Sequence, residues 1–90
     1  MAWRILVTAS ARRAILRLPD HAARRIERAI DALADNPRPA GVRKLVGAED
    51  LYRIRIGDYR IVYQIQERSA TVTVVRIGHR GDVYRLGWGV

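Results

Sequence analysis

The sequence predicts an α+β domain in the order β-α-α-β-β-β, with two N-terminal helices packed on one face of a mainly antiparallel sheet. The period of the apolar residues predicts this class. Between Ala11 and Leu33 they recur every three or four positions, as on one face of a helix, and from Leu51 onward they recur at every second position, as in strands. Ninety residues suffice for one domain, and we expect residues 1–90 to form it.

The N-terminal part is expected to form a strand and two helices. Residues 3–7 are short and apolar, as in a buried strand, and Thr8 or Ser10 can cap the helix that follows. Pro19 ends this helix, and Asp20 can cap a second helix over residues 21–34. The apolar stripes are Ala11, Ala14, Ile15 and Leu18 in the first helix, and Ala22, Ile26, Ala29, Ile30 and Leu33 in the second.

The C-terminal part is expected to form three strands. Residues 51–56 and 59–66 make a hairpin around the pair Gly57-Asp58, which suits a tight two-residue turn. Residues 71–78 make the third strand, which follows a short connection.

The hairpin register places three arginines on one face of the sheet. A two-residue turn sets these pairs opposite each other: Ile56 and Tyr59, Arg55 and Arg60, Arg53 and Val62. The alternate positions form an apolar face for the helices: Tyr52, Ile54, Ile56, Tyr59, Ile61, Tyr63 and Ile65. The other face gathers Arg53, Arg55 and Arg60 with no Asp or Glu. Because facing like charges destabilise a sheet, the cluster suggests a site for phosphate or carboxylate, with an ordinary solvated sheet face as the alternative.

The residues after the hairpin extend this set. Arg76 has the parity of Val72 and Val74 and is included in it. Arg80 and Tyr84 reach the same face if the chain folds back. His79 has the parity opposite to Arg76, toward the core face, so we interpret it as structural.

The net charge of the chain limits the classes of binding partner. Seventeen Lys and Arg against nine Asp and Glu give a net charge of +8, which favours nucleic acid, an acidic protein or an anionic membrane as a partner. A GC-rich genome explains part of the preference for Arg over Lys, but not the net charge. The chain has no Cys, which excludes disulfides, thiolate catalysis and Cys-based zinc sites. The sequence shows no signal peptide and no apolar run of membrane-spanning length, so we expect a cytoplasmic protein that binds no membrane. We also expect no metal and no cofactor.

The segment Leu51-Tyr-Arg-Ile-Arg-Ile-Gly-Asp-Tyr-Arg-Ile-Val-Tyr-Gln-Ile, followed by Ile77-Gly-His-Arg and Asp82-Val-Tyr, resembles the RelE/ParE toxin superfamily. The resemblance implies the toxin of a type II toxin–antitoxin system, a ribosome-dependent mRNA endoribonuclease (mRNA interferase). In such toxins a ribose 2′-OH attacks the adjacent phosphate. The catalytic residues that the resemblance implies are Arg60, Arg80 and Tyr84. We expect RNA binding by Arg53 and Arg55, which match basic residues of the family, and also by Lys44 and Arg76.

The resemblance also implies binding partners for the toxin, and it leaves two alternative functions open. The partners are a cognate acidic antitoxin, the ribosome with its mRNA, and operator DNA only through the antitoxin complex. The best-known members carry Lys at the positions of Arg53 and Arg55, and arginine cannot act as a base as lysine does. ParE-type relatives inhibit DNA gyrase and cleave no RNA, and they lack the full arginine and tyrosine set. A simple nucleic-acid-binding module is the third interpretation.

Overall fold

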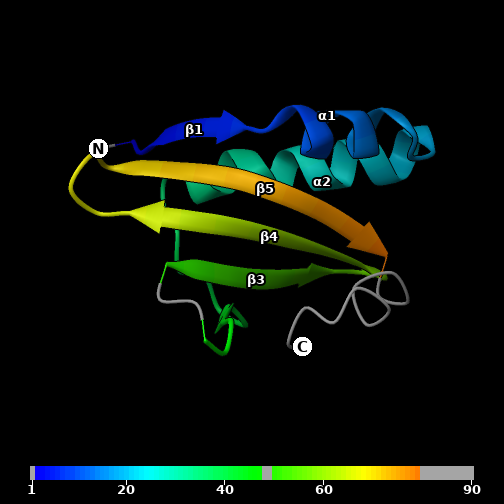
Figure 1. Ribbon diagram of the computed structural model, residues 1–90. Helices are drawn as coiled ribbons and strands as arrows, with labels where there is room; N and C mark the ends of the chain where they lie inside the picture. Colours follow the sequence, from blue (N-terminus) through cyan, green and yellow to red (C-terminus); the bar gives the residue numbers. More distant parts are fainter. Residues whose placement is uncertain (1, 48–49, 80–90) are drawn as a thin grey trace.

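The computed structural model describes residues 2–47 and 50–79, which form two helices and a five-stranded sheet (Figure 1). The helices are α1 (Ala9–Leu16) and α2 (Asp20–Leu33). The strands are β1 (Arg4–Val7), β2 (Arg43–Lys44), β3 (Leu51–Ile56), β4 (Tyr59–Gln66) and β5 (Thr71–His79). The strand order is β1-β5-β4-β3-β2, and only the β1–β5 pair is parallel. The α+β class and the mainly antiparallel sheet are therefore confirmed.

Both helices lie against one face of the sheet, and β1 leads directly into α1 (Figure 1). Of the two predicted caps of α1, the structure has Thr8, whose side chain accepts a hydrogen bond from the amide of Ala11. The predicted cap for α2 is wrong. Pro19 occupies the cap position without a side-chain hydrogen bond, and Asp20 is the first helical residue, where its charge favours the positive end of the helix dipole.

The β3–β4 hairpin has the predicted register, with Ile56 opposite Tyr59 and Arg55 opposite Arg60. Gly57 in the turn has a φ of 61°, a conformation that glycine adopts without steric cost. A Cβ at this position would also lie 2.9 Å from Nη1 of Arg25 on α2. The turn therefore favours glycine, whereas the contact with the flexible end of the Arg25 side chain could be relieved by a small shift of that side chain.

Strand β5 contains an irregularity that the sequence did not predict. Val62 pairs with Arg76, whereas the next residue, Tyr63, pairs with Val74, so Val75 is an extra residue in β5. Thr8 lies beside this bulge and donates a hydrogen bond from Oγ1 to the carbonyl of Val75 at 3.2 Å. The bulge reverses the side-chain alternation along β5.

The core lies between the helices and the sheet. Its buried members come from both helices and from β4 and β5, and they are Ala11, Ile15, Ile26, Ile30, Leu33, Ile61, Tyr63, Ile65, Val72, Val74 and Ile77. Tyr63 is the largest of them, and its hydroxyl donates a 2.7 Å hydrogen bond to the carbonyl of Pro37. Burial raises the pKa of Tyr63 above its usual value near 10. The predicted apolar face of the hairpin is confirmed, since its remaining members, Tyr52, Ile54, Ile56 and Tyr59, pack against this core.

No helix in the described ranges is both long enough and apolar enough to cross a membrane.

Candidate functional site

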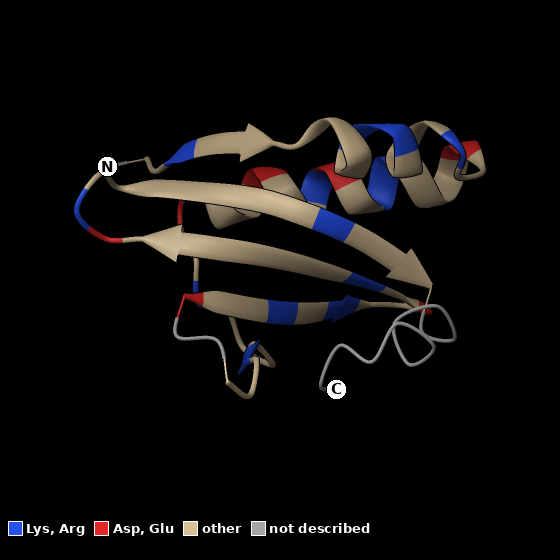
Figure 2. Cartoon of the chain, viewed as in Figure 1, with Lys and Arg blue, Asp and Glu red and all other residues tan. Residues whose placement is uncertain are grey.

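Arginines from three strands lie on the sheet face that points away from the helices. The pairing of β3, β4 and β5 aligns them in two rows across the sheet, Arg53–Val62–Arg76 and Arg55–Arg60–Gly78. We call Arg53, Arg55, Arg60 and Arg76 the basic face. Figure 2 shows these basic positions on β3, β4 and β5 toward the end of the sheet where β5 terminates.

The strand positions of this face include no acidic residue. On β3, β4 and β5 these positions are Leu51, Arg53, Arg55, Arg60, Val62, Gln64, Gln66, Thr71, Thr73, Arg76 and Gly78. Sheet faces in solvent normally mix the two signs of charge. Side chains of one sign gathered on one face create a positive potential that attracts anions, so the face suits a polyanion such as RNA.

The members of the basic face differ in exposure. Arg55 and Arg76 are exposed and Arg53 is half-buried, whereas Arg60 is only 3% exposed. On β4, Arg60 lies between Arg55 and Gly78, so only one of its cross-strand neighbours has a side chain. The low exposure of Arg60 places this cation in a poorly solvated environment, where charges interact more strongly than in water.

The predicted parity of Arg76 is wrong, because the bulge at Val75 shifts the side-chain alternation of β5. By alternation alone, Arg76 shares a face with Val72 and Val74. In the structure these two valines are fully buried in the core, and Arg76 lies on the opposite face beside Val62. Arg76 therefore joins the row of Arg53 only because β5 contains the extra residue.

The structure places Lys44 on the opposite face of the sheet from Arg53, Arg55 and Arg76, with which the sequence analysis had grouped it. Lys44 on β2 pairs with Tyr52, whose ring stacks on Tyr63 in the core with a centroid distance of 6.2 Å. Lys44 thus has the parity of the helix side. Its neighbour Arg43 pairs with Arg53 and has the parity of the basic face. Sequence reasoning missed Arg43 because a two-residue strand has no alternation to detect.

The remaining predicted residues are placed as follows. Arg80 and Tyr84 lie outside the described residues. His79 pairs with Tyr59, and the two rings meet edge to face with centroids 5.6 Å apart. Because Tyr59 packs on the core, His79 lies on the helix side as predicted, away from the basic face.

A cluster around Arg38 supports β3 from the other end of the sheet. Nη2 of Arg38 lies 2.6 Å from Oε1 of Glu67, and the guanidinium carbon lies 5.3 Å from the centre of the Tyr52 ring. Hydrogen bonds to Tyr52 and Glu67 raise the pKa of Arg38. These contacts hold the segment after α2 against the strand that carries Arg53 and Arg55.

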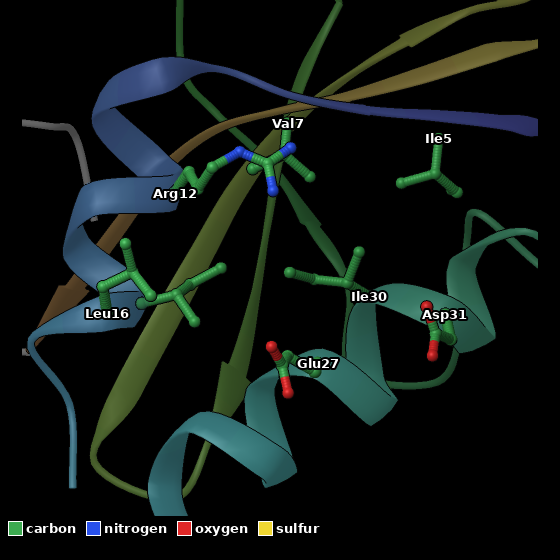
Figure 3. Close-up of a pocket in the computed structure, with 8 residues that line it drawn as sticks. Ile5, Val7, Arg12, Leu16, Glu27, Ile30 and Asp31 are labelled. Carbon is green, nitrogen blue, oxygen red and sulfur yellow. The ribbon is translucent and has the colours of Figure 1, made fainter. Parts of the chain in front are cut away.

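A groove of about 370 Å³ lies on the helix side, between α1, α2 and β1 (Figure 3). It has an apolar floor, with Arg12 on one wall and two acids of α2 on the other. Its lining residues are Ile5, Val7, Arg12, Ile15, Leu16, Glu27, Ile30 and Asp31. None of the predicted site residues within 2–47 and 50–79 lines this groove, and the basic face and the groove are on opposite sides of the sheet.

Comparisons with known proteins agree with the fold and the motif. A family model described as the ParE toxin of type II toxin–antitoxin systems matches residues 5–84. Toxin RelE of Mycobacterium tuberculosis is 34% identical over 85 residues, which cover 93% of this chain and 88% of the relative. Toxin RelG of the same organism is 34% identical over 89 residues, which cover 94% of this chain and 99% of the relative.

Solved structures give the same result. The archaeal RelE–RelB complex from Pyrococcus horikoshii contains a chain similar to this one with a TM-score of 0.80 and 31% identity, covering 90% of this chain and 98% of that one. A mutant of Escherichia coli toxin RelE in the free state has a TM-score of 0.79 at 22% identity, covering 99% of this chain and 95% of that one, which supports the fold alone. The chain belongs to the ParE toxin family of type II toxin–antitoxin systems. It is a toxin of the RelE type, as the motif from Tyr52 to Tyr63 indicated.

Proposed function

We propose that this toxin is a ribosome-dependent endoribonuclease that cleaves mRNA in the cytoplasm. The observation that carries the proposal is the basic face, on which Arg55 pairs with Arg60 and Arg53 shares a row with Arg76. Such a face gathers guanidinium groups, which bind phosphates in fork geometry, and its positions on β3, β4 and β5 include no carboxylate. Similarity to toxins named RelE supports the same activity.

The proposed reaction is a transfer within the RNA strand. The 2′-oxygen forms a bond to the adjacent phosphorus while the bond from phosphorus to the 5′-oxygen breaks, which leaves a cyclic 2′,3′-phosphate and a 5′-hydroxyl. The 2′-hydroxyl gives its proton to a base, and the leaving 5′-oxygen takes up a proton. Negative charge grows on the phosphoryl oxygens, and fixed cations stabilise that charge without reorganising.

The site residues have separate roles in this proposal. Arg60 and Arg80 stabilise the phosphoryl charge, and Arg60 is suited to this because it is almost fully buried. Tyr84 accepts the proton of the 2′-hydroxyl or positions it, since arginine cannot act as a base. Arg53 and Arg55 anchor flanking phosphates.

Dependence on the ribosome follows from the residues that the basic face does not have. Self-sufficient ribonucleases pair a general acid with a general base, often His with Glu. The basic face has neither residue at its strand positions, and His79 lies on the helix side. The ribosome therefore supplies the positioning of the mRNA and part of the proton transfer.

The partner that restrains the toxin is proposed to be an acidic antitoxin, because the chain carries a net charge of +8. Relatives from Pyrococcus horikoshii and Escherichia coli were solved as RelE–RelB complexes. The antitoxin binds the basic face or displaces the C-terminal segment, and operator DNA is contacted only through the complex. Copurification from the native operon tests this, and recovery of the toxin alone would argue against it.

The second candidate function is inhibition of DNA gyrase without RNA cleavage, favoured by the match to a family model that carries the name ParE. Two assays with the same purified toxin separate the candidates. In one, ribosomes programmed with mRNA are incubated with the toxin and the RNA ends are mapped; in the other, gyrase supercoiling is measured. We expect cleavage with a cyclic phosphate on the upstream fragment and unimpaired supercoiling. Inhibited gyrase with intact mRNA would assign the second function.

A further inference from the structure

The basic face continues past the predicted site to the edge of the sheet. On β2, Arg43 pairs with Arg53, which pairs with Val62, which pairs with Arg76. A single row therefore crosses four strands, with arginine at three of its four positions. Arg43 is exposed at the outer end of this row, on the edge strand.

The backbone around Arg43 is held in place, although the strand is short. The amide of Leu45 donates to the carbonyl of Leu51 at 2.9 Å, and the amide of Val42 donates to that of Pro39 at 3.1 Å. Leu45 is buried, and Val42 packs against the core. The position of Arg43 on the sheet is thus fixed from both sides, while its long side chain stays in solvent.

The side chain of Arg43 is available for a ligand. Within residues 2–47 and 50–79, no ion pair and no side-chain hydrogen bond involves it, and the nearest positions of its face on β3 are Leu51, Arg53 and Arg55. Placing one arginine opposite another across two strands costs stability. An anion that binds beside Arg43 and Arg53 offsets part of that cost.

The length of the row fits several nucleotides. Neighbouring strands lie about 4.8 Å apart, so the backbone positions of Arg43 and Arg76 are separated by three such steps, roughly 14 Å. A stacked nucleic-acid strand rises about 3.4 Å per nucleotide. A strand laid along the row therefore places more than one phosphate within reach of its arginines.

We propose that Arg43 binds a backbone phosphate of the mRNA outside the cleavage step, and that the substrate strand crosses the sheet perpendicular to β3 and β4. This inference rests on the proposed function and adds a contact to the same face. Lys44, which the sequence suggested for RNA binding, has the opposite parity and makes no such contact. The anchor adds affinity and not rate, because the row of Arg43 is next to the row of Arg60 and not part of it.

Two substitutions on adjacent residues test this. Arg43→Ala and Lys44→Ala each remove one positive charge from β2, so they change the net charge equally and differ only in the face they affect. Arg17→Ala removes one positive charge at an exposed position on the helix side, and it serves as the control for loss of charge away from the basic face. The equilibrium affinity of each protein is measured over a series of salt concentrations for ribosomes carrying either an mRNA that runs through the decoding site or one that ends before it. Thermal melting checks that each variant folds.

With the longer mRNA, Arg43→Ala should weaken binding about threefold to tenfold, the range for one lost hydrogen-bonded contact. Its salt slope should fall by about 0.7, the value for one phosphate of a single strand. Lys44→Ala and Arg17→Ala should match the wild type, Arg43→Lys should recover most of the affinity, and the shorter mRNA should abolish the difference.

Several results would overturn the inference: equal losses for Arg43→Ala and Lys44→Ala, no loss for Arg43→Ala, or the same loss with both mRNAs, which would assign the contact to the ribosome. Binding is measured whether or not the toxin cleaves. A wild type that binds the longer mRNA without cutting it would refute the proposed nuclease while still deciding the role of Arg43.

Discussion

The hydroxyl of Thr8 joins the start of α1 to the bulge of β5 through Val75. It accepts a hydrogen bond from the amide of Ala11 at 3.2 Å and donates one to the carbonyl of Val75 at the same distance, while the amide of Thr8 donates to the carbonyl of Val74 at 3.0 Å. The bulge decides on which face Arg76 lies. One threonine therefore connects the helix layer to the arrangement of the basic face.

The first prediction concerns this threonine. Thr8→Val keeps the shape of the side chain but removes both hydrogen bonds, so it should lower the free energy of unfolding by about 1–2 kcal/mol, the scale for losing a helix cap. Urea unfolding followed by circular dichroism measures it. Thr8→Ser, which keeps the hydroxyl, should retain most of the stability. A Thr8→Val protein as stable as the wild type would show that neither bond contributes.

The second prediction concerns the hydroxyl of Tyr63. Tyr63→Phe leaves the carbonyl of Pro37 without its donor and should cost about 1–3 kcal/mol, the penalty for a buried unsatisfied polar group. Tyr52→Phe is the matched control, because the Tyr52 hydroxyl lies on the partly exposed side at 3.4 Å from Arg38. Its loss should be well below that of Tyr63→Phe in the same unfolding experiment. Equal effects would contradict the assignment.

The third prediction is the alkaline behaviour of the same residue. Burial raises the pKa of Tyr63 in the folded state above its value in the unfolded chain, which is about 10. Its contribution to stability is complete below about pH 10 and falls as the pH rises, because only the unfolded state then loses the proton. The wild type should lose up to about 1.4 kcal/mol per pH unit more than Tyr63→Phe above this pH. Parallel stability curves for the two proteins would refute this.

The fourth prediction separates anchoring from chemistry. Arg53→Ala removes a half-buried guanidinium from the row shared with Arg76, so it should weaken binding to programmed ribosomes and reduce its salt dependence by about one phosphate contact. The cleavage rate at saturating toxin should change little. A large fall in that rate with unchanged affinity would place Arg53 in the reaction itself.

How much of this molecule could be predicted depends on whether the determinants are local. The hairpin register was correct because a two-residue turn fixes every pair beyond it, down to Arg55 opposite Arg60. Strand β2 was missed because Arg43 and Lys44 form a strand only through their pairing with β3. The bulge was missed because nothing in the run from Thr73 to Arg76 marks Val75 as the extra residue; its carbonyl is bound by Thr8, which is 67 residues away.

In the candidate site, too, only the features with local determinants could be predicted. Its arginines on β3 and β4 were grouped correctly, because the side chains of these strands alternate regularly. Arg76 lies on the same face only because of the bulge at Val75, which the alternation of residues does not predict. The near-complete burial of Arg60 was not predicted, because exposure depends on what packs over a side chain and not on its strand parity. The toxin class was predicted from the motif between Tyr52 and Tyr63 together with the ending from Gly78 to Tyr84, and the comparisons confirm the class.

The fifth prediction tests the central claim, that arginines of the basic face and Tyr84 cleave mRNA on the ribosome. The measurement is the single-turnover rate of mRNA cleavage on programmed ribosomes for the wild type, Arg60→Ala, Arg80→Ala and Tyr84→Phe. Each arginine variant should be slower by about a hundredfold or more, the effect of losing one fixed oxyanion donor. Tyr84→Phe should be slower by roughly 10²–10⁴-fold with ribosome binding nearly unchanged, the scale of a lost general base. A Tyr84→Phe protein as fast as the wild type would contradict the role of Tyr84, and fast cleavage by all three variants would contradict the nuclease site as a whole.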